Sequence, residues 1–175
     1  MKRTALIVFV LFTQTVPVAA TEIEEIGIIQ TTFEGESFTQ PTVLMTGPNE
    51  TTSTAYLFRA GAGFSSLTLS SLSKGKPRVF LEVGYIAAMP SLDTAPIMTA
   101  VTYAPSGTGQ HWSSEEAPVL PRVTFTALDI DGDEGRAVGT FEALLCFTKD
   151  YGEDADLGNC RSIQGRFDSR FIIQE

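Results

Sequence analysis

Three aspartates in the segment 129–135 have the spacing of a metal site. Asp129, Asp131 and Asp133 place carboxylates at positions one, three and five, as at the start of a calcium-binding loop. The loop pattern then fails, because its sixth position is Glu134 instead of glycine and its twelfth is Thr140 instead of a bidentate Glu. A polar hairpin turn accounts for the same residues, since Asp and Gly tolerate the backbone angles of tight turns. We therefore expect a turn here and keep calcium as the alternative.

A second acidic group lies between the two cysteines of the chain. It contains Asp150, Asp154 and Asp156, together with Glu153. Carboxylates on so short a loop repel one another unless they are solvated or countered. Three interpretations stay open: a solvated face, a weak calcium site, and a contact surface for a basic partner.

The only histidine, His111, stands beside the only tryptophan, Trp112. A Ser–His–acid or Cys–His arrangement would have to use His111, and its Gly-flanked segment shows no sign of a catalytic partner. We therefore assign no catalytic residue. Exposed aromatic residues on loops often anchor partners, but a loop aromatic can also fold back onto the domain edge. Trp112 joins Asp150, Asp154 and Asp156 as a candidate partner-binding residue.

Cys146 and Cys160 are the only cysteines. In an oxidising compartment such a pair forms a disulfide more readily than a reactive thiol or a metal site. The ring would contain about 15 residues, and its closure stabilises a chain by roughly 3 kcal/mol. We predict a structural disulfide that clamps the base of the loop Lys149 to Asn159.

The first twenty residues have the features of a signal peptide. Lys2 and Arg3 precede an apolar run from Leu6 to Phe12, and Val18 and Ala20 supply the small residues that a signal peptidase needs. The apolar run is far shorter than the ~20 residues of a membrane span. We expect cleavage after Ala20, leaving one domain over residues 21–175 that is periplasmic or secreted and has no membrane anchor.

The mature chain is strongly acidic. Removal of the first twenty residues leaves ten basic residues against twenty-one acidic ones, a net charge of −11. Nucleic-acid binding depends on Lys and Arg that neutralise phosphates, so this balance argues against it. No motif for a cofactor is present, and none is expected. The partner is unknown; a basic protein or a small ligand suits the charge.

Alternation with a period of two is the main local pattern. It predicts half-buried antiparallel strands with a core that includes Phe125, Phe141, Leu145, Ile163, Phe167 and Phe171. The nine expected strands cover residues 26–33, 42–45, 54–60, 65–72, 78–87, 97–103, 122–130, 136–147 and 161–173. The segment from Tyr103 to Pro121 is expected to be one long irregular loop. The pattern predicts an all-β fold of about eight or nine strands, an antiparallel β-sandwich or alternatively a small β-barrel.

Two of the last strands share a Gly-x-Phe spacing, in Gly139-Thr140-Phe141 and Gly165-Arg166-Phe167. Each glycine leaves a gap that an aromatic side chain from the neighbouring strand can cover, so we expect the two strands to pair. With the two cysteines, the stretch Val123 to Ile173 resembles a group of uncharacterised exported bacterial proteins. The resemblance implies a β-sandwich and no known activity.

Three functional hypotheses follow from these features. The first is an exported, non-enzymatic protein that binds a partner or ligand through its loops. The second is a small secreted inhibitor or immunity-type protein whose acidic loops face a basic enzyme. The third, and the weakest, is a hydrolase that uses His111.

Export can be tested on the protein itself. The intact mass of the exported protein should match a chain that begins at Thr21, because the small residues at 18 and 20 direct cleavage there. Retention of Met1 in mature material would contradict the prediction.

Overall fold

The computed structural model describes residues 21–61, 63–72, 77–106 and 109–175. The predicted signal peptide lies outside these residues. The described chain contains no helix long and apolar enough to cross a membrane. Its strands are β1 (Glu22–Phe33), β2 (Glu36–Thr46), β3 (Thr51–Ser53), β4 (Ala55–Ala60), β5 (Phe64–Ser70), β6 (Arg78–Tyr85), β7 (Met98–Ala104), β8 (His111–Ser113), β9 (Arg122–Asp131), β10 (Glu134–Thr148) and β11 (Asp156–Gln174).

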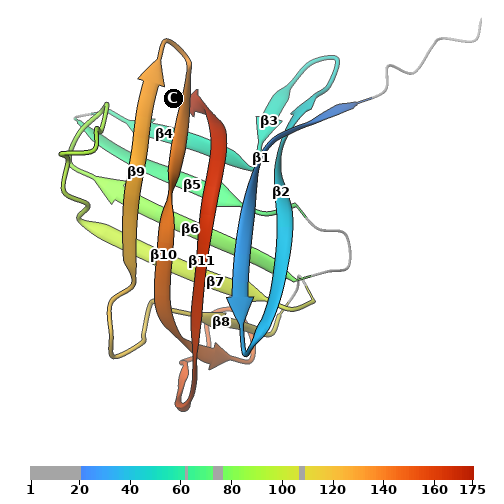
Figure 1. Cartoon of the computed structure of the whole chain (residues 1–175), viewed down its shortest axis with the longest axis vertical. Coiled ribbons are helices and arrows are strands. Elements are labelled where there is room, and N and C mark those ends of the chain that lie inside the picture. The colour runs from blue at the N-terminus through green and yellow to red at the C-terminus, as the bar shows by residue number, and fades with distance from the viewer. Residues whose placement is uncertain (1–20, 62, 73–76, 107–108) are drawn as a thin grey trace, which may run out of the picture.

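The strands form one mostly antiparallel sheet that turns back on itself. Their order is β3-β2-β1-β11-β4-β5-β6-β7-β8-β10-β9, and an additional pairing of β10 with β11 gives a partial ring. The contact of β11 with β4 is parallel, and the other pairings are antiparallel. In Figure 1, β9, β10, β11, β1 and β2 form a front layer, and β4 to β7 cross behind it.

The all-β class is confirmed, and each of the nine expected strands is present. The described residues form eleven strands, so the prediction of eight or nine was wrong. The two additional strands, β3 and β8, have three residues each, which is too short to show an alternating pattern. The prediction of one irregular loop from Tyr103 to Pro121 was also wrong, because β8 lies within that segment and pairs with β7 and β10.

The core lies between the two layers and uses the inward face that the alternation predicted. Five of the six predicted core residues are at most 3% exposed, and the sixth, Phe125, is partly buried and packs against them. Phe125 meets Phe167 edge-on, with ring centroids 5.6 Å apart. The five are Phe141, Leu145, Ile163, Phe167 and Phe171.

Glycine–phenylalanine pairs connect β10 and β11. Gly139 is the register partner of Phe167, and Gly165 is the partner of Phe141. A Cβ atom placed on Gly165 would come within 2.5 Å of the Phe141 ring and within 2.4 Å of the Gln30 carbonyl oxygen. The bare backbone therefore accepts the ring, and the pairing that the Gly-x-Phe spacing predicted is confirmed.

The Cys146–Cys160 disulfide is present, as predicted. The two cysteines are directly opposite each other in the β10–β11 ladder, with Cα atoms 4.0 Å apart. The register shifts immediately afterwards, between Cys146 and Phe147. The disulfide thus joins the two strands at the point where their regular pairing ends and the loop 149–155 begins.

Gly165→Ala tests the glycine–phenylalanine contact. The added methyl group has no room, because one of its neighbours is backbone. Overpacking of this kind costs about 1–3 kcal/mol, and we expect the melting temperature to fall by several degrees in thermal unfolding. Gly61→Ala is the matched control, since a Cβ there meets nothing within 4 Å. Equal stability of the two variants would contradict the packing argument.

Candidate functional site

The structure brings together two segments that the sequence singled out separately. β8 pairs with the end of β10, so that Thr148 faces His111 and Phe147 faces Trp112. The loop 149–155 leaves β10 directly after Thr148 and therefore begins beside the only histidine. A hydrogen bond between Glu116 and Ala155, which are 39 residues apart in the sequence, joins the two candidate binding segments into one region.

Two contacts hold this loop against β8 and the residues that follow it, and a third stabilises the loop itself. The ring of Tyr151 stacks on the imidazole of His111, with centroids 4.7 Å apart and an angle of 20° between the planes. The Ala155 amide donates a hydrogen bond to Oε2 of Glu116 over 3.0 Å. Asp150 Oδ1 accepts a hydrogen bond of 2.8 Å from the Tyr151 amide, which stabilises the first turn of the loop.

An acidic cleft separates the loop from the outer face of the back layer. It consists of two adjoining hollows of about 400 and 220 Å³ that share His111, Ser113, Glu115 and Tyr151. Among the described residues, four carboxylates and one basic side chain, that of Arg78, line the cleft. The four are Glu115, Glu116, Glu153 and Asp154. The cleft therefore favours a cationic group.

His111 lies at the base of this cleft and is only 8% exposed. Its Nδ1 is 2.8 Å from the carbonyl oxygen of Gly109 and donates a hydrogen bond to it. Within the described part of the chain, His111 makes no hydrogen bond to a serine, threonine or cysteine. Nucleophilic catalysis needs such a bond between nucleophile and base, so the geometry gives the hydrolase hypothesis no support.

The three aspartates proposed for partner binding take different positions. Asp154 lines the acidic cleft. Asp150 lies in the same loop, and its carboxylate accepts a hydrogen bond from the Tyr151 amide. Asp156 begins β11 and accepts a hydrogen bond of 3.0 Å from the Gly158 amide. The carboxylates of Glu115 and Glu116 come from the segment after β8, and no spacing in the sequence indicates that they meet Asp154.

Trp112 points to the opposite side of β8 from His111. Its partly buried ring packs against the core, with centroids 4.9 Å from Phe147, 5.6 Å from Phe33 and 6.2 Å from Tyr103. This cluster joins the front layer to the back layer. The position agrees with the interpretation in which Trp112 holds its segment on the domain edge.

The aspartates at 129, 131 and 133 lie at the β9–β10 hairpin. Asp131 pairs with Glu134, and the tight turn between them is completed by Gly132 at φ 62°. Asp129 is opposite Arg136 in the same ladder. Among the residues described, no group of three or more His, Cys, Asp or Glu side chains is arranged to hold a metal ion. The hairpin interpretation accounts for these residues.

No protein-family model matches the chain, and searches of curated proteins and of solved structures found no similar protein. The resemblance of the C-terminal stretch to exported bacterial proteins therefore stays a prediction.

Trp112→Ala tests how much the indole of Trp112 contributes to the stability of the fold. Removing it opens a cavity beside three aromatic rings, and we expect a loss of about 3 kcal/mol in the free energy of unfolding, measured by denaturant titration. Tyr151→Ala is the control, because Tyr151 is 69% exposed and the loss of its stacking on His111 should cost only about 1 kcal/mol. A Trp112 variant as stable as the control would contradict the structural role and favour a role of the indole in partner binding.

Proposed function

We propose that this chain is an exported, non-enzymatic binding protein whose acidic cleft receives lysine or arginine side chains of a basic partner. The observation that supports the proposal is the contact between β8 and the loop 149–155, which gathers carboxylates from two distant segments around one hollow. Exposed acidic residues on separate loops would not create such a site. A rigid, shared cleft can select a cation by position as well as by charge.

Tyr151 gives the cleft a second means of holding a cation. One face of its ring lies on His111, and 69% of the side chain is exposed. A guanidinium or ammonium group that enters the cleft can lie over the free face of this ring while carboxylates contact its N–H groups. This arrangement favours arginine, whose planar group stacks as well as donates.

The net charge of −11 expected for the mature chain supports the same partner class. A surplus of negative charge attracts a basic protein over a distance and raises its association rate. The disulfide at the base of the loop lowers the entropy lost when the loop binds, since the loop ends are already fixed. The disulfide supports export to an oxidising compartment, and export would place the cleft where such a partner can reach it.

The architecture that we propose for this binding protein is a two-layer β-sandwich. The crossing of the two layers in Figure 1 and the single core between them support this interpretation. In a sandwich the loops at the ends are free to vary while the layers carry stability, so the position of the cleft at one end suits a binding role.

A triple variant, Glu115→Gln, Glu153→Gln and Asp154→Asn, tests the proposal. It removes three charges from the acidic cleft and spares Glu116, which holds the loop. Capture from the native exported fraction should recover one basic partner with the unaltered protein, and the variant should associate with it at least about tenfold more slowly at low salt. Surface plasmon resonance at low and high salt would measure the association rates of the variant and of the unaltered protein.

The matched control removes the same number of charges elsewhere, with Asp129→Asn, Asp131→Asn and Asp133→Asn at the β9–β10 hairpin. If both variants slow association equally, only the total charge matters and the cleft assignment is wrong. Capture of acidic or neutral partners alone would contradict the proposal itself. Inhibition of a captured basic enzyme would favour the inhibitor hypothesis over a supporting role.

A further inference from the structure

A second surface, on the outer face of the front layer, carries two registered rows of polar side chains. Each row crosses the five strands β2, β1, β11, β10 and β9 through direct register partners. Neighbouring strands are about 4.8 Å apart, so a row extends about 19 Å. One row is Ser37, Thr32, Gln164, Glu142 and Arg122, and the other is Thr39, Gln30, Arg166, Thr140 and Thr124.

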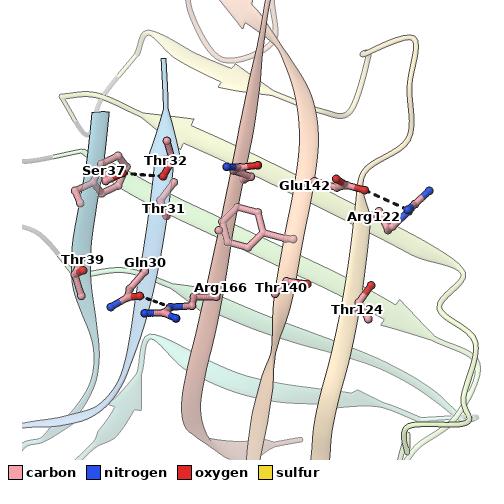
Figure 2. Close-up of a pocket in the computed structure, with 14 residues that line it drawn as sticks. Gln30, Thr31, Thr32, Ser37, Thr39, Arg122, Thr124, Thr140, Glu142 and Arg166 are labelled. Carbon is pink, nitrogen blue, oxygen red and sulfur yellow. Dashed lines mark hydrogen bonds and ion pairs between the residues drawn. The ribbon is translucent and has the colours of Figure 1, made fainter. Parts of the chain in front are cut away.

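These rows line a polar groove (Figure 2). The first hollow has a volume of about 700 Å³, and a second of about 790 Å³ shares Thr32, Arg122, Glu142 and Gln164 with it. Both volumes are in the range of sites that bind small ligands. The groove and the acidic cleft have no lining residue in common.

Arg166 is the one cationic side chain of the rows that lacks a carboxylate partner in the described structure. Its Nε donates a hydrogen bond to Oε1 of Gln30, and Figure 2 shows the two side chains meeting between β11 and β1. The other arginines that lie on this face or line the groove form ion pairs: Arg122 with Glu142, Arg136 with Asp168, Arg161 with Glu34, and Arg170 with Glu24. In so acidic a protein, an exposed and unpaired guanidinium at the centre of a groove is complementary to an anionic group.

The remaining groups of the groove suit hydroxyls. Thr140, Thr124 and Thr39 offer hydroxyl groups on either side of Arg166, and Gln164 adds an amide in the neighbouring row. Val119 and Leu120 line the second hollow and are 58% and 86% exposed. They provide an apolar lip against which the C–H face of a sugar ring can pack.

An extended peptide fits this surface less well. Peptides that add to sheets gain affinity from free backbone groups at an edge strand. Here the middle strands β1, β11 and β10 each have a partner on both sides, so their backbone groups are already used within the sheet. A ligand on this face must be recognised by side chains, and most of those side chains are hydroxyls and amides.

We propose that the polar groove binds an oligosaccharide that carries a carboxylate. The carboxylate accepts hydrogen bonds from the guanidinium of Arg166, and sugar hydroxyls contact the threonine and glutamine side chains of the two rows. The net charge of −11 expected for the mature chain opposes a densely charged polyanion, so the ligand has few carboxylates along its length. The site is independent of the acidic cleft and of its basic partner.

The test compares two trisaccharides of the same linkage, one ending in glucuronic acid and the other in glucose. Titration of the isotope-labelled exported protein, followed by amide NMR shifts, gives both the affinity and the site. We expect the acidic trisaccharide to bind at least tenfold more tightly, with shifts in β1, β10 and β11. Arg166→Gln should remove this difference. Arg136→Gln, which removes the same charge from the same face outside the groove, should preserve it.

Three results would overturn the proposal. They are equal affinity for the two sugars, binding that Arg166→Gln leaves unchanged, and shifts confined to residues outside the groove. Failure of both sugars to bind, with saturable binding of a peptide that bears one glutamate, would assign the groove to a peptide. Capture of the basic partner should be the same for Arg166→Gln and the unaltered protein, so failure here is distinguishable from failure of the proposed function.

Discussion

The contact between phenylalanine rings and glycine backbone across β10 and β11 is the constraint on which the rest of the fold depends. Phe141 covers Gly165 and Phe167 covers Gly139, so each ring requires the glycine opposite and fixes the register. A slip by one residue would turn every inward side chain to the solvent face. β11 also pairs with β1 and β4, and β10 also pairs with β8 and β9. The register of the β10–β11 pair therefore positions strands of both layers.

Both candidate binding surfaces follow from that register. Along β11 the inward residues are mostly apolar, with Ser169 as the buried polar exception, and the outward set includes Gln164 and Arg166 of the groove. At the end of the same ladder, Cys146 and Cys160 join the strands and the loop 149–155 departs toward β8. The core, the groove and the cleft are thus three consequences of one strand pairing, on its inner face, its outer face and its end.

The sequence predicted the parts of this arrangement that are local. The alternation along residues 161–173 predicted the buried face of β11, and the lone cysteine pair predicted the disulfide. The cleft was not predictable, because it depends on β8, whose three residues carry no pattern, and on its pairing with β10 some 35 residues later. The groove was hidden for the same reason: Gln30 and Arg166 meet through a pairing of strands 136 residues apart, which no local spacing encodes.

The two proposed sites can have opposite preferences in one small acidic protein because electrostatic interactions in salt solution are short-ranged. At physiological ionic strength the field of an exposed charge decays over about 8 Å, less than half the length of one polar row. A carboxylate bound at Arg166 would therefore interact mainly with the charges of nearby side chains. Among these, Arg122 and Glu142 already neutralise each other. A cation in the cleft responds mainly to its four carboxylates. Lower salt extends the field of the whole chain, which should favour the cationic partner and oppose the anionic ligand, so ionic strength acts on the two sites in opposite directions.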